Sequence, residues 1–144
     1  MAKAGFVVDA VDSEPLAIRY LTAMSAYDIH PHLQDIASFK IPSNHYQLIV
    51  AWNSLQFLSR WRFRRMIKKI REALPHGGVF VFNFFGKNGD SVKSGFARGI
   101  TMKEVKEIFK NFRFIHQLEY EENAKSATGP LMHWHMIRGV VQKL

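Results

Sequence analysis

Two pairs of histidines carry the side chains best suited to binding a metal ion. His133 and His135 stand two residues apart in an apolar segment, and His30 and His32 flank Pro31 at the same spacing. In an extended strand this spacing places both imidazoles on one face, where they could share a metal. Because neither pair has an evident third ligand, we interpret these residues as packing and hydrogen-bonding groups and predict no metal site.

A glycine-rich segment over residues 86–99 is the other stretch whose composition suits a ligand-binding loop. Residues 86–91 read Gly-Lys-Asn-Gly-Asp-Ser, but the G-x-x-x-x-G-K-[ST] spacing of phosphate loops is absent. The glycines and scattered charges predict instead a mobile loop that covers a substrate. No Ser/His/Asp order indicates nucleophilic catalysis, so the sequence assigns no catalytic residue.

A basic segment over residues 60–71 holds much of the positive charge of the chain, which is +8 overall. Such a charge favours anionic partners, and the interleaved Trp61 and Phe63 could stack on nucleic-acid bases. The same residues also follow the pattern of an amphipathic helix whose basic side faces solvent. We therefore treat nucleic-acid binding through this segment as a lesser alternative.

The overall composition indicates one globular domain over residues 1–144. The chain is 47% hydrophobic, which suffices for an ordinary core and excludes low-complexity disorder. No apolar run approaches the ~20 residues that span a bilayer, and no signal-peptide core follows the first residue. The absence of cysteine excludes disulfides and thiolate sites and is compatible with the cytoplasm, where we expect the protein.

The elements that must position these residues alternate between strand and helix. Apolar runs predict strands over 6–11, 27–30, 46–51, 79–85, 114–120 and 133–141. The last two follow each other through the Gly129-Pro130 turn, which indicates an antiparallel hairpin. The earlier strands are separated by helical segments, which predicts a parallel sheet.

Helix boundaries are also visible in the sequence. Ser13 is a candidate N-cap for a helix that begins at Pro15. A second helix is expected over 59–74, with an apolar stripe facing inward. Thr101 and Glu104 form a T-x-x-E capping box that opens a third helix.

In their order and spacing, these segments resemble class I S-adenosylmethionine-dependent methyltransferases of the tellurite-resistance type. Five segments carry the resemblance. Residues 5–12 match the second strand of the family, 33–36 the acidic turn after its third strand, 46–50 its fourth strand, 74–81 the L-x-P-G-G turn before its fifth strand, and 133–136 its last strand. Gln47 departs from the usual aspartate, and His76 is inserted in the turn. The resemblance implies an α/β, Rossmann-like three-layer sandwich, a mostly parallel sheet with a C-terminal antiparallel hairpin, and a small-molecule substrate.

The resemblance also implies a set of residues for the cofactor S-adenosylmethionine. Asp12 would accept hydrogen bonds from the ribose hydroxyls, Asp35 would bind the adenine amino group, and Ile36 would pack on the ring. The alternatives are that Asp12 caps the following helix together with Ser13, and that Asp35 is a solvated loop acid.

Three further residues follow the expected fourth strand, where this family lines the cofactor and the substrate mouth. They are Ala51, Trp52 and Asn53, and Asn53 could orient a substrate donor. The alternative is that Trp52 belongs to the core and Asn53 to a turn.

One motif of the family is absent. The first strand normally ends in a G-x-G-x-G loop that holds the methionine end of the cofactor, and no such motif occurs in the chain. We expect a domain that starts after its first strand, which would leave two sheet edges unpaired. Either the second strand pairs directly with the fourth, or a partner supplies a strand; we favour a homo-oligomer. The polypeptide would be an impaired or inactive methyltransferase, or alternatively a non-catalytic interaction or small-ligand-binding module.

Overall fold

The structure is a computed structural model that describes residues 1–127 and 129–144. It divides into two compact units, Met1–Lys40 and Ile41–Leu144, and each is described by itself. Three of the five strand pairings among the described residues are parallel, and a C-terminal antiparallel hairpin follows them. The expected α/β fold is therefore confirmed, and the expectation of a single domain stays a prediction.

The first unit is a small strand–helix–strand element. Its elements are η1 (Ala2–Ala4), β1 (Val8–Asp12), α1 (Pro15–Thr22) and β2 (Ile29–Leu33). The two strands are parallel, with Asp12 opposite Leu33 at their carboxyl ends. The helix begins at Pro15 as predicted, but its N-cap is Glu14 and not Ser13. Asp12 Oδ1 accepts the Glu14 N–H at 2.9 Å and so holds Ser13 in the preceding turn.

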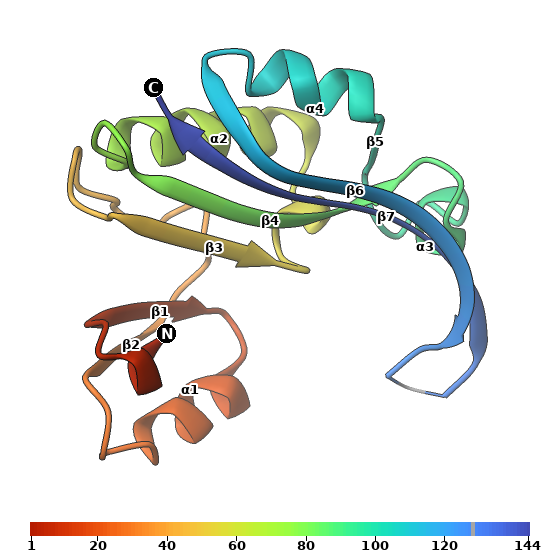
Figure 1. Ribbon diagram of the computed structural model, residues 1–144. Helices are drawn as coiled ribbons and strands as arrows, with labels where there is room; N and C mark the ends of the chain where they lie inside the picture. The colour runs from red at the N-terminus through yellow and green to blue at the C-terminus, as the bar shows by residue number, and fades with distance from the viewer. Residues whose placement is uncertain (128) are drawn as a thin grey trace. The chain divides into compact units, whose positions relative to one another are not determined.

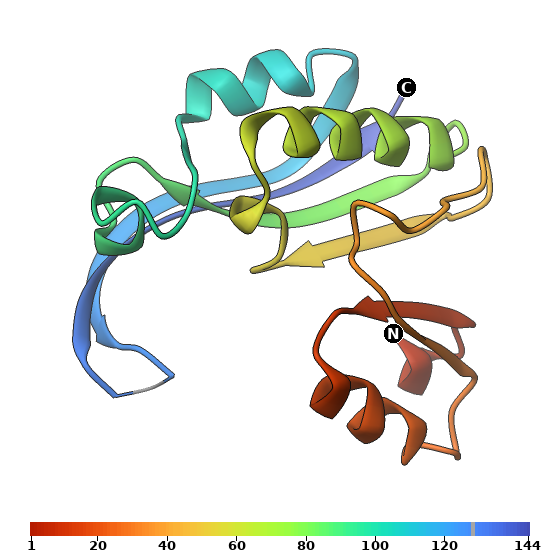
Figure 2. The same cartoon turned by 180° about the vertical axis from the view of Figure 1, so that it is seen from behind.

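The second unit contains one sheet with helices against it. Its elements are β3 (Leu48–Trp52), η2 (Leu55–Phe57), α2 (Arg60–Ala73), β4 (Val79–Gly86), α3 (Asp90–Lys93), β5 (Gly99–Ile100), α4 (Met102–Ile108), β6 (Phe112–Lys125) and β7 (Leu131–Lys143). The strand order is β3-β4-β7-β6, and β5 pairs with β4. Helices α2 and α4 cover the same face of this sheet (Figure 1, Figure 2).

The core of the second unit lies between that face and the two helices. Phe80, Phe82 and Phe84 alternate along β4 and are fully buried. Phe82 stacks on Phe84 and on Phe109, which follows α4, with ring centroids 4.5 and 5.2 Å apart. The apolar stripe of α2 completes the core, as its helical spacing predicts.

A glycine allows β7 to cross the phenylalanine layer. Gly139 lies opposite Phe82 in the antiparallel pair, and a Cβ at this position would stand 2.2 Å from Phe82 Cζ. Any side chain there would displace the ring. The close contact explains how the last strand can pack beside β4 without opening the core.

In the first unit, the strand expected over 27–30 is found as β2 at Ile29–Leu33 and contains Pro31. Two segments of the second unit also differ from the sequence-based expectation. Residues 86–99 are not simply a loop, because they contain α3 and lead into β5. The hairpin strands are also longer than 114–120 and 133–141. They extend beyond the end of β4 as a curved two-stranded ribbon (Figure 1), with a register irregularity between Phe114 and His116.

Two further findings concern the assignment of strands to sheets and the length of the helices. Strand β1 belongs to the two-stranded sheet of the first unit, and β3 belongs to the five-stranded sheet of the second. Among the described residues, none of the helices has the length and apolar character needed to cross a membrane.

Candidate functional site

Two of the predicted carboxylates lie at one edge of the first unit. Asp12 is the last residue of β1, and Asp35 follows β2 by two residues. The backbone N–H of Gln34 donates to the carbonyl oxygen of Asp12 at 2.9 Å and ties the two strand ends together. The structure therefore brings both acids to the carboxyl edge of a parallel strand pair, where ligands bind in open α/β sheets.

Both acids also take part in local turns. Asp12 Oδ1 accepts from Glu14 N at 2.9 Å, and Asp35 Oδ1 accepts from Ala37 N at 2.8 Å. These bonds hold the side chains in fixed directions, and both residues are exposed. Ile36 is half-buried beside them. Such an edge offers carboxylate oxygens to ligand hydroxyl or amino groups next to a partly apolar surface.

The predicted residues of the second unit lie at the end of β3. Ala51 is buried, and Trp52 is half exposed. Asn53 follows the strand with φ 49°, a left-handed conformation that asparagine tolerates better than most residues. Its Oδ1 accepts a hydrogen bond of 2.5 Å from Nδ2 of Asn83, which stands opposite Trp52 in the neighbouring strand.

A cluster of side-chain amides surrounds Asn53. Gln56 Nε2 lies 3.5 Å from the same Asn53 oxygen, and both Gln56 and Asn83 are almost fully buried. Gln56 Oε1 and Asn83 Oδ1 are buried acceptors with no hydrogen-bond partner among the described residues. Unsatisfied buried acceptors of this kind are costly, at about 1–3 kcal/mol each. The cluster is therefore more polar than packing alone requires.

A cation lies directly beside these amides. Arg138 stands opposite Asn83 in the β4–β7 pair, and its guanidinium lies 5.2 Å from the ring centre of Trp52 and 4.8 Å from that of Tyr120. Its Nε is buried without a hydrogen-bond partner, and no carboxylate in the described part of the chain pairs with it. The two aromatic rings hold the charge in place through cation–π contacts.

Four residues of this cluster were not predicted from the sequence: Asn83, Gln56, Arg138 and Tyr120. Asn83 does carry a signal, because it is the only polar residue within the apolar run 79–85. Arg138 likewise interrupts the apolar end of the last strand. Neither signal says which residues meet, since that depends on the strand register.

The histidines of β7 form hydrogen bonds with carboxylates. His135 Nδ1 accepts the backbone N–H of Asn88 at 3.1 Å, so the ring proton is on Nε2, which donates to Glu119 at 3.0 Å. His133 Nε2 lies 2.8 Å from Glu121 Oε2. No three His, Asp or Glu side chains converge as metal ligands in the described residues.

This network connects the β6–β7 ribbon to the start of the segment after β4. Hydrogen bonds from the Asn88 side-chain amide, and then from His133, lower the pKa of Glu121. Gly86 leaves room for the His135 ring, because a Cβ there would stand 2.3 Å from the imidazole. The histidines thus have structural partners that fix the ribbon.

The chemistry open to these residues is binding and orientation. The carboxylates of the first unit are exposed hydrogen-bond acceptors, and the second unit holds a largely buried amide cluster beside one positive charge. Neither group contains a nucleophile next to a base.

A match between the sequence and a protein-family model identifies the family of this chain. The family model described as tellurite resistance protein TehB matches residues 1–128. The chain belongs to the TehB family. This agrees with the resemblance inferred from the order of its segments. No curated protein sequence matches the chain.

Solved structures share the fold of this TehB-family chain. TehB from Haemophilus influenzae superposes with a TM-score of 0.81 at 19% identity, and the match covers 99% of this chain and 52% of that one. A SAM-dependent methyltransferase from Methanosarcina mazei gives 0.75 at 15% identity, with 99% and 84% covered. The N-methyltransferase NodS from Bradyrhizobium japonicum WM9, in complex with S-adenosyl-L-homocysteine, gives 0.72 at 17% identity, with 94% and 65% covered.

These likenesses establish a methyltransferase-type fold. The chain spans about half the length of the Haemophilus influenzae TehB chain that it resembles. Its own sequence has acidic residues at or just beyond the carboxyl ends of two strands, Asp12 and Asp35, and contains no G-x-G-x-G run within its 144 residues.

Proposed function

We propose that this chain is a cytoplasmic methyltransferase-type domain that binds the nucleoside part of S-adenosylmethionine and, by itself, transfers methyl groups poorly or not at all. Membership of the TehB family supports the cofactor class. The observation that carries the proposal is the pairing of Asp12 and Asp35 at one carboxyl edge, joined by the Gln34–Asp12 backbone bond. When bound, the cofactor supplies an electrophilic methyl group.

The donors and acceptors of this edge fit a nucleoside. Asp12 would accept from the ribose hydroxyls, Asp35 from the adenine amino group, and Ile36 would contact the ring. Both carboxylates are exposed and already oriented by their turn bonds, so little ordering is needed on binding.

The residues proposed to line the cofactor and the substrate mouth in the second unit are Ala51, Trp52 and Asn53. The Asn53 amide would orient a donor group of a small-molecule substrate. The bond from Asn83 fixes this side chain, which favours a positioning role over a passive turn. Methyl transfer needs in-line placement more than a strong acid or base, so the absence of a base in this cluster is compatible with the reaction.

The proposed impairment concerns the amino-acid tail of the cofactor. Binding that tail requires backbone N–H groups that approach closely, which glycines permit. The sequence contains no G-x-G-x-G run, and its positive-φ glycines are Gly5, Gly77, Gly95 and Gly129, which lie apart in the chain. Without such a cradle the tail contributes little affinity and the sulfonium is poorly positioned.

We also propose a homo-oligomer through unpaired strand edges. Among the described residues, β1 pairs only with β2, and β3 pairs only with β4. Val50 and Trp52 of β3 are 43% and 49% exposed. Open edges with apolar residues favour pairing with a second chain. Light scattering should give a multiple of 16.7 kDa, and Val50→Lys should shift it toward 16.7 kDa; a wild-type monomer at high concentration would contradict this proposal.

Adenosine binding to isosteric variants that remove one carboxylate charge each tests the nucleoside site. Asp12→Asn and Asp35→Asn should each weaken adenosine binding about tenfold, because each removes a charged acceptor. Asp28→Asn is the matched control, since Asp28 is an exposed acid just before β2, at the opposite end of that strand. Its affinity should equal that of the wild type.

The binding results distinguish the proposed nucleoside site from its alternatives. Equal losses in all three variants would indicate a general charge effect and contradict the assigned site. No adenosine or S-adenosylmethionine binding at millimolar ligand would favour the alternative of a non-catalytic interaction module.

A further inference from the structure

The solvent face of α2 is almost uniformly positive. The helix carries seven basic residues and one acidic residue, Glu72, while the whole chain has a net charge of +8. Its apolar stripe is buried in the core, so the basic side chains project to the other side. A helix pattern explains why they are outside, but it does not explain why nearly all of them have the same sign.

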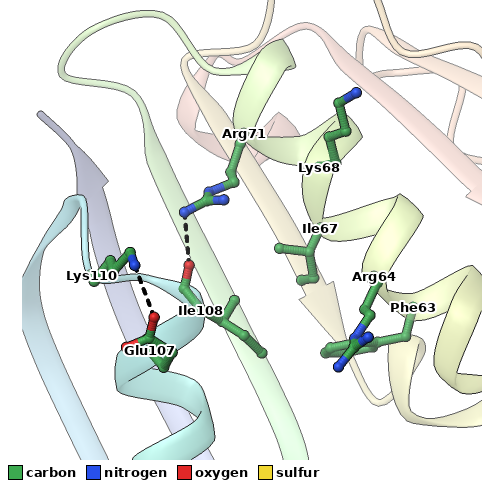
Figure 3. Close-up of a pocket in the computed structure, with 8 residues that line it drawn as sticks. All are labelled: Phe63, Arg64, Ile67, Lys68, Arg71, Glu107, Ile108 and Lys110. Carbon is green, nitrogen blue, oxygen red and sulfur yellow. Dashed lines mark hydrogen bonds and ion pairs between the residues drawn. The ribbon is translucent and has the colours of Figure 1, made fainter.

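Three of these basic residues line a groove between α2 and α4 (Figure 3). The groove has a volume of about 320 Å³. Its charged lining residues are Arg64, Lys68 and Arg71 from α2, Lys110 beyond α4, and one acidic residue, Glu107 of α4. The three α2 residues follow one another at intervals of four and three positions, so they stand about one helical turn, or roughly 5 Å, apart along the axis. Such a row matches repeated phosphate groups.

The positive charges of the groove are only partly neutralised. Lys68 lies 3.7 Å from Glu72 and Lys110 lies 2.9 Å from Glu107, but both pairs are exposed and therefore weak. Arg71 donates to the carbonyl oxygen of Ile108 at 2.9 Å, which fixes its guanidinium without cancelling its charge.

Further cations crowd the start of the helix. Burial lowers the pKa of Arg98, and the neighbouring charges of Arg60 and Arg64 lower it further, against the opposing effect of Glu104. The first turn of α2 contains no acidic residue, although the helix dipole favours one there. This concentration of positive charge is unfavourable in the free protein and would be relieved by a bound polyanion.

An aromatic side chain stands in the middle of the basic face. Trp61 is 66% exposed, although tryptophan is usually buried. The Arg65 guanidinium lies 5.4 Å from its ring centre. An exposed ring beside arginines is the arrangement on which unpaired bases stack.

We propose that the basic face of α2, with the α2–α4 groove and Trp61, binds single-stranded nucleic acid. The phosphates would lie along Arg64, Lys68 and Arg71, and a base would stack on Trp61. Paired bases cannot present a free face to Trp61, which disfavours a duplex. An anionic membrane would gain little from one aromatic residue on a helix whose apolar side is already buried.

Fluorescence anisotropy with a labelled 15-nucleotide oligouridylate tests this surface, and it requires no methyltransferase cofactor. Micromolar affinity in low salt is expected. The slope of the logarithm of the binding constant against the logarithm of the salt concentration should decrease in magnitude by about 0.7 per removed phosphate contact. An Arg64→Gln/Lys68→Gln double variant should therefore reduce it by about 1.4. A Lys93→Gln/Lys125→Gln double variant removes the same charge from exposed residues elsewhere and should leave the slope unchanged.

Trp61 provides an independent readout. Trp61→Ala should weaken binding about tenfold without changing the salt slope, and Trp61→Phe should restore most of it. Base stacking should also quench a part of the wild-type emission that is missing from Trp61→Phe.

Several results would overturn the proposal. The first is no binding of the oligonucleotide at a protein concentration about 100-fold above the expected dissociation constant. The second is an equal loss of salt-slope magnitude in the two double variants, and the third is no effect of Trp61→Ala on affinity. Binding to phosphatidylserine vesicles without binding to the oligonucleotide would assign the face to a membrane instead. All these results leave adenosine binding at Asp12 and Asp35 unaffected, so failure here is distinct from failure of the proposed function.

Discussion

Asn83 Nδ2 donates a hydrogen bond of 2.5 Å to Asn53 Oδ1 and so joins buried strand β4 to the residue that follows β3. The bond holds Asn53 in a left-handed conformation with φ 49°. This bond is the main contact that positions the Asn53 side chain, which we propose orients the substrate. The other donor to the same oxygen, Gln56 Nε2, lies farther away at 3.5 Å.

Substitutions at Asn53 should separate the hydrogen bond from the backbone conformation. Asn53→Ala removes the acceptor of a buried donor and adds strain at positive φ, so it should cost about 2–3 kcal/mol of unfolding free energy. Asn53→Gly loses the same bond without the strain and should cost about 1 kcal/mol less. Urea unfolding measures both; equal stabilities of the two variants would contradict the role assigned to the backbone.

Arg138 should respond differently to removal of its charge and removal of its side chain. Arg138→Met keeps the contacts with Trp52 and Tyr120 and removes the buried, unpaired Nε, so stability should stay within about 0.5 kcal/mol of the wild type. Arg138→Ala loses the packing as well and should cost about 1–2 kcal/mol. Thermal unfolding of both variants is the measurement. A methionine variant as unstable as the alanine variant would show that the charge itself stabilises the site.

Gly139 should tolerate no side chain while Phe82 is present. Gly139→Ala places a Cβ 2.2 Å from the ring and should cost about 2 kcal/mol through overpacking. Phe82→Leu removes the clashing ring atoms, so the double variant should be more stable than the sum of the single effects by about 1 kcal/mol. Additive losses in the double-mutant cycle would contradict a direct clash.

The α4 capping box should make stability depend on pH. Hydrogen bonding from the Thr101 backbone N–H lowers the pKa of Glu104 below 4.5, and Lys87 Nζ lies 3.3 Å from its carboxylate. A carboxyl group with a lowered folded pKa stabilises the fold above its unfolded pKa, and the stability is lost as pH falls through the folded pKa.

Glu104→Gln should therefore be less stable than the wild type by about 0.5–1 kcal/mol at pH 7. The difference should shrink once the pH falls below 4.5 and vanish below the folded pKa. Urea unfolding from pH 7 to pH 3 measures it; a constant difference over this range would contradict the charged cap.

The features that the sequence predicted correctly depend on local pattern. The Thr101–Glu104 box is a four-residue motif, and both of its hydrogen bonds form. The stripe of α2 follows from helical spacing, and the buried run of β4 follows from continuous apolar character. Local rules of this kind do not need the tertiary structure.

The features that it missed depend on register. Arg138 meets Asn83 and Tyr120 only because β7 lies between β4 and β6, and the irregularity near Phe114 sets which residues of β6 share a face. The N-cap at Glu14 arises because the Glu14 side chain accepts the Leu16 N–H, while Asp12 accepts the Glu14 N–H in the preceding turn. No spacing rule fixes these long-range or competing contacts.

The central claim, a nucleoside site without an anchor for the amino-acid tail, is tested most directly by calorimetry with two ligands. S-adenosyl-L-homocysteine carries the tail and 5′-methylthioadenosine lacks it, so an unanchored tail predicts dissociation constants within about fivefold of each other. An affinity for S-adenosyl-L-homocysteine that is about 100-fold higher, or methyl turnover by the isolated chain, would contradict the account.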